Sequence, residues 1–213
     1  MRKSLIIIAV IAFLLQGCGT SYLQTSTNVS NTKKQYDKIL VVSRSKDKTA
    51  RIAFENKVAA DLKTRGINAE SSYTIIKMDL LSQDLSEANI AAIKNDLVRK
   101  GFNGVIVTNL IDTNQYTDVV PGSSGTVYYP VRYGRFGRYY AHYPVNYWGA
   151  DQIESGVEYT LESCLYDITE SQSDNLQWVG RFKVRNPSDL MKTIDVYSKE
   201  LTEALLKESI SVE

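Results

Sequence analysis

The sequence predicts an α/β fold with an α+β tendency, in which helices pack on a mixed sheet. Three segments with strand character, residues 39–42, 67–76 and 104–108, alternate with two helical patterns. After a long insert, two segments of alternating polarity are followed by a last helical pattern. Alternation of strands and helices is typical of α/β folds, so the predicted order is β-α-β-α-β, insert, β-hairpin, α.

The first eighteen residues have the pattern of a lipoprotein signal peptide. The positively charged residues 2–3 precede an unbroken apolar run at 5–15, which is too short to span a bilayer. Residues 15–18, LQGC, resemble a lipobox, in which a peptidase cleaves before a cysteine that carries diacylglycerol. Residues 1–17 are therefore predicted to be a signal peptide and Cys18 the lipidation site. The alternative is an ordinary signal peptide that is cleaved elsewhere.

The predicted lipid anchor determines where the protein is expected to act. Several acyl chains on Cys18, palmitate among them, would hold it on a membrane, because each buried methylene contributes about 0.8 kcal/mol. Gly19 rather than aspartate follows the cysteine, so the periplasmic side of a Gram-negative outer membrane is expected. Residues 18–36 are polar and rich in Ser, Thr and Asn, which predicts a flexible tether. Residues 37–210 are predicted to form a single α/β domain.

Composition excludes several classes of function. The formal net charge of +1 gives no field that would favour nucleic acid. His142 is the only histidine, which excludes the common zinc motifs. The two cysteines, Cys18 and Cys164, leave no disulfide framework if Cys18 is acylated. We therefore expect no metal, no cofactor and no nucleic-acid partner.

The first half of the domain has clear helix and strand signals. Residues 39–42 are continuously apolar, as in a strand buried on both faces. Helices are predicted at 49–65 and 87–100, because apolar residues recur at helical spacing and a glycine follows each pattern. Residues 67–76 are predicted to be extended and 104–108 to be a third strand. Right-handed crossovers would make these three strands parallel.

Residues 157–166 and 176–184 alternate in polarity on either side of a polar turn, which predicts a β-hairpin. One register satisfies both faces, and its pairs are Tyr159–Val184, Leu161–Phe182, Glu162–Arg181 and Leu165–Trp178. Glu158 and Glu162 are then solvated strand positions. The last helix is predicted to begin with Asn186 as N-cap and to bury a stripe of Leu190, Ile194, Tyr197, Leu201 and Leu205.

The insert, residues 112–151, has no helical pattern and is rich in Tyr, Arg and Gly. Its centre contains no acidic residue, and tyrosine with arginine is enriched at binding surfaces. The candidate binding residues are Tyr128, Tyr129, Arg132, Tyr133, Arg135, Phe136, Arg138, Tyr139, Tyr140, Tyr143, Tyr147 and Trp148. The alternatives are a solvated loop or hairpin without a partner, a contact surface for an envelope protein or glycan, and contact with a membrane interface.

No pattern of catalytic residues is present. His142 has no serine or cysteine paired with it in the sequence, and neither a nucleophile elbow nor a phosphate loop occurs. Glu158 and Glu162 would lie about 13 Å apart on a strand, whereas glycosidase carboxylates need about 5–9.5 Å. We therefore expect that the protein is not an enzyme.

The lipobox, residues 39–42, and the segments GINAESSYTII, GFNGVIVTNL and ESCLYDITESQSDNLQWVGRFKVRNPSDL resemble small uncharacterised Gram-negative lipoproteins with a domain of unknown function. The core is similar to the periplasmic α/β domain of curli-secretion-channel and TolB-amino-terminal-like proteins. The resemblance covers residues 37–210 and is one of pattern, without a catalytic motif. The Tyr-rich insert has no counterpart in it.

These observations predict a non-catalytic, outer-membrane-anchored periplasmic lipoprotein that binds another cell-envelope component through the insert. The first alternative is a structural or assembly subunit, in which copies join into a homo-oligomer by strand addition. The second is a glycan- or small-molecule-processing enzyme, for which the sequence offers no site.

Overall fold

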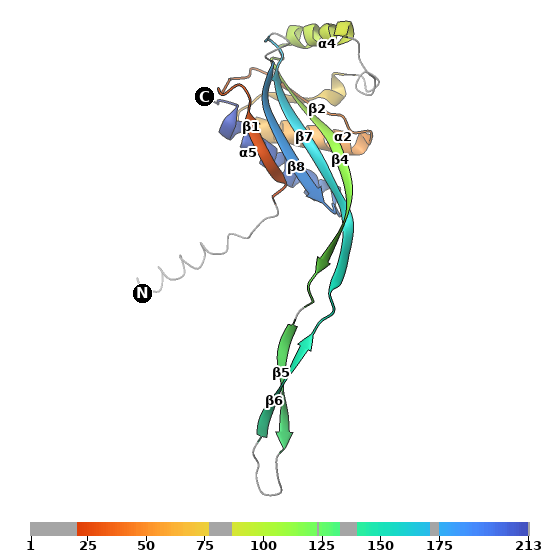
Figure 1. Cartoon of the computed structure of the whole chain (residues 1–213). Helices are drawn as coiled ribbons and strands as arrows, with labels where there is room; N and C mark the ends of the chain where they lie inside the picture. Colours follow the sequence, from red (N-terminus) through yellow and green to blue (C-terminus); the bar gives the residue numbers. More distant parts are fainter. Residues whose placement is uncertain (1–20, 77–86, 123, 133–139, 171–174, 213) are drawn as a thin grey trace, which may run out of the picture.

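The computed structural model describes residues 21–76, 87–122, 124–132, 140–170 and 175–212. It contains a mixed six-stranded sheet in the order β1-β8-β7-β4-β2-β3 and a separate two-stranded sheet, β5–β6. Figure 1 shows β5 and β6 at the end of a long ribbon that projects from the main domain. The predicted fold class, a mixed sheet with helices packed on it, is confirmed.

The strands are β1 (Leu23–Asn28), β2 (Ile39–Ser43), β3 (Ala69–Ser71), β4 (Gly104–Val120), β5 (Ser124–Arg132), β6 (Tyr140–Trp148), β7 (Gln152–Asp167) and β8 (Leu176–Arg185). The helices are α2 (Lys48–Thr64), α4 (Glu87–Arg99) and α5 (Leu190–Glu208), and a 3-10 turn, η1 (Ser72–Thr74), follows β3. As predicted, β2 is parallel to β3 and to β4. The β4–β7, β7–β8 and β1–β8 pairs are antiparallel.

The main core lies between the sheet and the pair of helices α2 and α5. Phe182 on β8 stacks on Tyr197 of α5 with ring centroids 4.1 Å apart, and Phe54 of α2 meets the same tyrosine edge-on at 5.3 Å. A second, smaller cluster of buried apolar side chains includes Leu40 of β2, Val105 of β4 and Leu97 of α4. Each fully buried apolar side chain contributes about 1.5–3 kcal/mol. No helix in the described ranges is both long enough and apolar enough to cross a membrane.

The predicted hairpin register is confirmed in full. β7 and β8 pair as Tyr159–Val184, Leu161–Phe182, Glu162–Arg181 and Leu165–Trp178. The predicted charged pair forms an ion pair, with Arg181 Nε 2.9 Å from Glu162 Oε2. A shift of one residue would turn every apolar side chain of this hairpin away from the core, which is why the alternation identified a single register.

The prediction of a flexible tether over residues 18–36 is wrong for the part that forms β1. This strand lies antiparallel to β8 at the edge of the sheet. Glu200 of α5 accepts hydrogen bonds from the backbone at its start, the shorter being 2.7 Å. Trp178 donates a hydrogen bond from Nε1 to Ser26 Oγ at 3.0 Å. An edge strand needs backbone pairing rather than an apolar pattern, so its polar composition did not reveal it.

The expectation of an extended segment over residues 67–76 holds only for the three residues of β3. The chain then turns into η1, and Tyr73 N donates a 2.9 Å hydrogen bond to Glu55 Oε2. Ser71 Oγ donates to the same carboxylate oxygen at 2.9 Å. Glu55 is fully buried on α2, so its charged carboxylate needs hydrogen-bond donors. The chain turns after β3 and supplies them, and the strand therefore ends early.

The predicted start of the last helix is wrong by one turn. The N-cap of α5 is Asp189, whose side chain accepts hydrogen bonds from Met191 N and Lys192 N. Asn186, the expected cap, has a left-handed backbone with φ of 43°. The inward stripe is otherwise as predicted, except that Leu190 is exposed. Asn186 is used elsewhere, in the contact described below.

Candidate functional site

The described residues of the Tyr-rich insert form two successive antiparallel ribbons. β4 continues past the sheet to Val120 and stays paired with β7 as far as the Val120–Gln152 pair. β5 and β6 then pair from Ser124–Trp148 to Arg132–Tyr140. We call residues 115–120 and 152–157 together with β5 and β6 the arm. Figure 1 shows it leaving the sheet at one end and extending away from the helices.

The inner half of the arm has no strand beside it among the described residues. The pairing of β2 with β4 ends at Ser43–Thr108, and that of β8 with β7 ends at Glu158–Arg185. Val119 and Ile153 form an opposed pair on the arm and are 62% and 74% exposed. The arm therefore presents apolar side chains and unpaired strand edges to its surroundings.

The base of the arm is held by Asn186. Its Oδ1 accepts a hydrogen bond from Val157 N at 2.8 Å, and its Nδ2 donates to Tyr116 Oη at 2.6 Å. A Cβ on Gly156 would lie 2.1 Å from Asn186 Oδ1, so a larger residue there would displace the Asn186 side chain from this contact. These contacts connect the segment after β8 to both strands of the arm and set the direction in which the arm leaves the domain.

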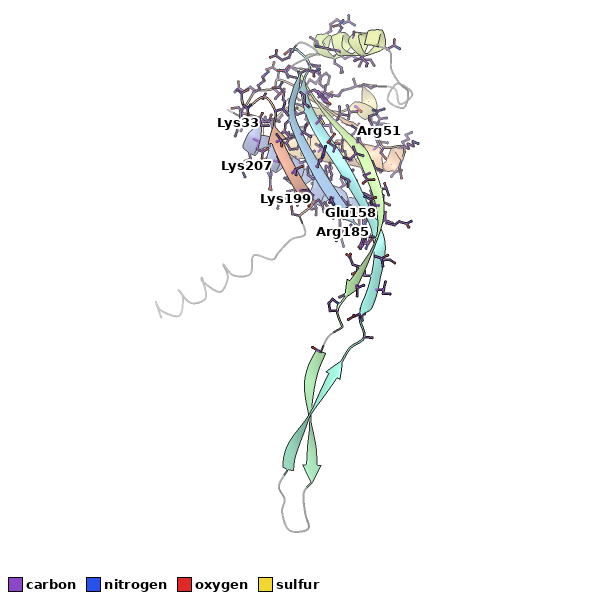
Figure 2. All side chains as sticks on the ribbon, viewed as in Figure 1. Lys33, Arg51, Glu158, Arg185, Lys199 and Lys207 are labelled. Atoms are coloured by element: carbon purple, nitrogen blue, oxygen red, sulfur yellow. The ribbon has the colours of Figure 1, made fainter. Side chains whose placement is uncertain are left out.

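A cluster of charges supports the same base. Glu158 is 7% exposed and accepts hydrogen bonds from Lys183 Nζ at 2.9 Å and from Arg185 Nε at 2.7 Å. Arg185 also lies over the ring of Tyr116, 5.0 Å from its centroid. Figure 2 shows Glu158 and Arg185 together where the arm begins. The prediction that Glu158 is solvated is wrong, because two basic side chains of β8 fold over it.

We expect Asn186→Ala to loosen the base of the arm. The substitution removes both side-chain hydrogen bonds and puts alanine in a left-handed conformation, so we expect a loss of about 1 kcal/mol of unfolding free energy. Amide exchange at Val157 should accelerate in the same variant. Thr117→Ser, on an exposed position of β4, is the control and should change neither quantity. Unchanged exchange at Val157 in Asn186→Ala would contradict this role of Asn186.

The charge cluster predicts a dependence of stability on pH. Hydrogen bonds from Lys183, and then from Arg185, hold the pKa of Glu158 below its usual value. Ionised Glu158 therefore stabilises the fold above its unfolded-state pKa of about 4.3, and this contribution is lost as the pH falls through the lower folded-state pKa. Urea midpoints measured from about pH 6 down to about pH 3 should fall less steeply in Glu158→Gln than in the wild type. Parallel curves would refute this assignment.

A glycine joint separates the two ribbons of the arm. Gly122 N donates a hydrogen bond to Asp151 Oδ1 at 2.9 Å. The two strands approach so closely that a Cβ on Gly122 would lie 2.0 Å from the carbonyl oxygen of Gly149. Regular pairing stops at Val120–Gln152 and resumes at Ser124–Trp148. The strand pairing of the two ribbons is thus interrupted at the described residues 121–122 and 149–151.

Seven of the twelve candidate residues lie on the outer ribbon. Tyr128, Tyr129 and Arg132 belong to β5, and Tyr140, Tyr143, Tyr147 and Trp148 belong to β6. The backbone register sets Tyr129 opposite Tyr143 and Arg132 opposite Tyr140. Tyr133, Arg135, Phe136, Arg138 and Tyr139 lie outside the described residues, as does Cys18.

The sequence interpretation missed the residues that hold the base of the arm. The sequence predicts a helix cap at Asn186 because Pro187 and an acid follow it. Gly156 did offer a signal, since a glycine inside an alternating strand often marks a close backbone approach. The partners of both residues are distant in the chain, so the sequence does not name them.

The described residues contain no group of three His, Cys, Asp or Glu side chains placed to hold a metal ion. Cys164 is buried, and its burial raises the pKa of the thiol, which disfavours the reactive thiolate. His142 lies on β6, where its backbone pairs with that of Pro130. The expectation of a non-catalytic protein remains a prediction.

The fold defines the chain as an α/β domain with a mixed sheet and a projecting β arm. No family model matches the sequence, and no curated protein sequence matches it. Among solved structures, it is similar to a PelC dodecamer from Paraburkholderia phytofirmans, with a TM-score of 0.44 and 12% identity over 84% of this chain and 96% of that chain.

The chain is also similar to lipoprotein GNA1162 from Neisseria meningitidis, with a TM-score of 0.39 and 13% identity over 80% of this chain and 99% of that chain. At these scores and identities both similarities are distant. They do not assign a function to this chain.

Proposed function

We propose that this protein is a non-catalytic lipoprotein, anchored through Cys18 on the periplasmic side of the outer membrane, that binds another envelope component through its arm. The observation that carries the proposal is the arm itself. It extends beyond the described sheet, exposes Val119 and Ile153, and ends in a ribbon whose candidate residues are tyrosine, arginine and tryptophan.

The physical argument for a partner is the low intrinsic stability of such a ribbon. A two-stranded ribbon is marginally stable in water by itself, because it has no second layer on which to bury its apolar side chains. Contiguous exposed apolar residues mark interaction sites. Tyrosine, tryptophan and arginine are enriched at the cores of protein interfaces. A bound partner would cover Val119 and Ile153 and so stabilise the extended arm.

An assembly subunit is the second candidate, favoured by the unpaired edges of the arm. Beyond Thr108, β4 has only β7 beside it, and before Glu158, β7 has only β4, within the described residues. Such edges can take up a strand from another copy. The mass of the detergent-solubilised protein separates the two candidates: a monomer favours the envelope-binding protein, and a closed oligomer favours the assembly subunit.

In-cell photo-crosslinking tests the binding function. A photoreactive amino acid is placed at Ile153 or Tyr140 on the arm, with Met191 on α5 as a matched control that is 55% exposed. A discrete adduct from the arm positions alone supports the proposal. Diffuse adducts that match those of Met191 would contradict it.

The anchor is tested separately. The wild type should carry acyl chains at Cys18 and float with outer-membrane vesicles in a density gradient. Cys18→Ser should lose both the added mass and the flotation. Flotation of Cys18→Ser at the wild-type level would contradict the assignment of the anchor.

A further inference from the structure

The start of β1 and the base of the arm lie at the same end of the sheet. Leu23 pairs with Phe182 of β8, and Arg185, three residues further along that strand, pairs with Glu158 at the base of the arm. A strand rises about 3.3 Å per residue, so only about 10 Å separates these two levels of the sheet. Figure 1 shows β1 beginning at the end of the domain from which the arm projects.

The chain between Cys18 and Leu23 is short. Five residues span at most about 18 Å when fully extended. A membrane that holds the lipids of Cys18 therefore lies at most about 8 Å beyond the base of the arm, measured along the strands. Glu200 Oε2 accepts hydrogen bonds from Tyr22 N at 2.9 Å and from Leu23 N at 2.7 Å. These bonds fix the start of β1 to the domain, so residues of β1 do not lengthen the tether.

The main domain prevents the arm from pointing away from that membrane. From Phe182 back to Leu176, β8 extends about 20 Å in the direction opposite to the arm. Figure 1 shows α4 lying at that opposite end of the domain. A helix adds a thickness of about 10 Å. A tether of about 18 Å cannot pass around this body, so the arm points toward the anchoring membrane or lies along it.

The length of the arm allows its outer ribbon to reach that membrane. From Glu158 to Gln152 the inner ribbon extends about 20 Å, and from Trp148 to Tyr140 the outer ribbon extends about 26 Å more. Both distances exceed the gap of about 8 Å that the tether allows. When the strands run toward the membrane, the arm is therefore long enough for β5 and β6 to reach the surface of the bilayer with the lipids of Cys18 inserted.

The distribution of charges along the arm matches this position. The inner ribbon carries Asp118 and Glu154, and Asp151 lies at the joint. Residues 119–150, which include β5 and β6, contain no acidic residue. The anionic headgroups of a membrane repel acids, and Tyr and Trp concentrate where headgroups meet acyl chains. The acid-free run thus coincides with the outer ribbon, the part of the arm furthest from the base.

We propose that the envelope component bound by the arm is the lipid surface of the anchoring membrane, with β5 and β6 lying in its headgroup region. This inference rests on the proposed anchor at Cys18. The arm then acts as a second contact that orients the domain on the membrane. Asn186 and the charge cluster hold the inner ribbon, and the glycine joint connects it to the outer ribbon.

The two tryptophans of the chain provide a direct test. Trp148 lies on β6, whereas Trp178 is fully buried in the domain core. The lipidated full-length protein is reconstituted into vesicles of phosphatidylethanolamine and phosphatidylglycerol, with plain acyl chains or with chains brominated near the headgroup. The wild type should lose about half of its emission in the brominated vesicles, because one of its two tryptophans is at the interface.

Trp148→Phe is the matched variant, since it retains Trp178 and should have equal emission in the two kinds of vesicle. Flotation of the same samples reports on the anchor independently. Vesicle-bound wild type without quenching would overturn the lipid contact and leave the anchor intact, and arm crosslinks to a protein or glycan would then name the partner. Wild type that does not float would overturn the anchor itself.

Discussion

Glu55→Gln is expected to lower the free energy of unfolding by about 3–5 kcal/mol, the cost of breaking a buried ion pair from one side. Glu55 is 0% exposed and Arg51 is 1% exposed, and Arg51 Nε donates to Glu55 Oε1 at 2.8 Å. The same carboxylate accepts four further hydrogen bonds, from Ser43 N, Ser71 Oγ, Ser72 Oγ and Tyr73 N. Glutamine cannot accept at both positions and leaves Arg51 charged without a counterion.

Urea unfolding monitored by tryptophan fluorescence is the measurement, because Trp178 is buried in the main core. The control is Glu203→Gln on α5, where an exposed carboxylate lies 3.6 Å from Arg65. Exposed pairs contribute little, so this variant should unfold at nearly the wild-type midpoint. Equal midpoints for Glu55→Gln and Glu203→Gln would show that the buried pair does not hold α2 to the ends of β2 and β3.

Phe182→Ala is expected to cost about 3–5 kcal/mol, because it empties a ring-sized volume in the main core. Phe182 is 0% exposed, stacks on Tyr197 and pairs with Leu161 and Leu23 on the neighbouring strands. The substitution therefore removes contacts to the sheet and to α5 at once. The urea midpoint should fall by more than that of any single change on the arm.

Val119→Ala is the matched control for Phe182→Ala, because it also shortens an apolar side chain on a paired strand but at a position that is 62% exposed. Its effect in detergent-free solution should be within about 0.5 kcal/mol of the wild type. A loss at Val119 comparable to that at Phe182 would mean that the arm is covered in solution by a second copy or by the domain.

The parts of the fold that followed from the sequence are those in which one side-chain pattern permits one arrangement. The β7–β8 register was predicted because polarity alternates on both strands and only one pairing satisfies both faces. Helices α2 and α4 were found from helical spacing and from Gly66 and Gly101, both of which have positive φ. Local physics was sufficient for these elements.

The parts that did not follow depend on partners far away in the chain. β1 has no apolar pattern, and its position is set by hydrogen bonds with β8 and α5. The sequence does not predict these hydrogen bonds. Glu158 alternates with apolar residues like a solvated position, yet Lys183 and Arg185 cover it. Asn186 has the local context of a helix cap, but its side chain instead accepts a hydrogen bond from Val157 N.

The candidate site shows the same division. The sequence by itself determined what the outer ribbon is made of, an acid-free run of tyrosines with arginine and tryptophan, and it indicated a lipid anchor at Cys18. Only the tertiary structure decided that the insert is an arm with hydrogen bonds at its base and that it leaves the domain at the same end of the sheet as the start of β1. The reason is physical: composition is a local property, whereas the direction of the arm follows from the pairing of Leu23 with Phe182 and from Asn186 binding Val157, contacts between residues far apart in the chain.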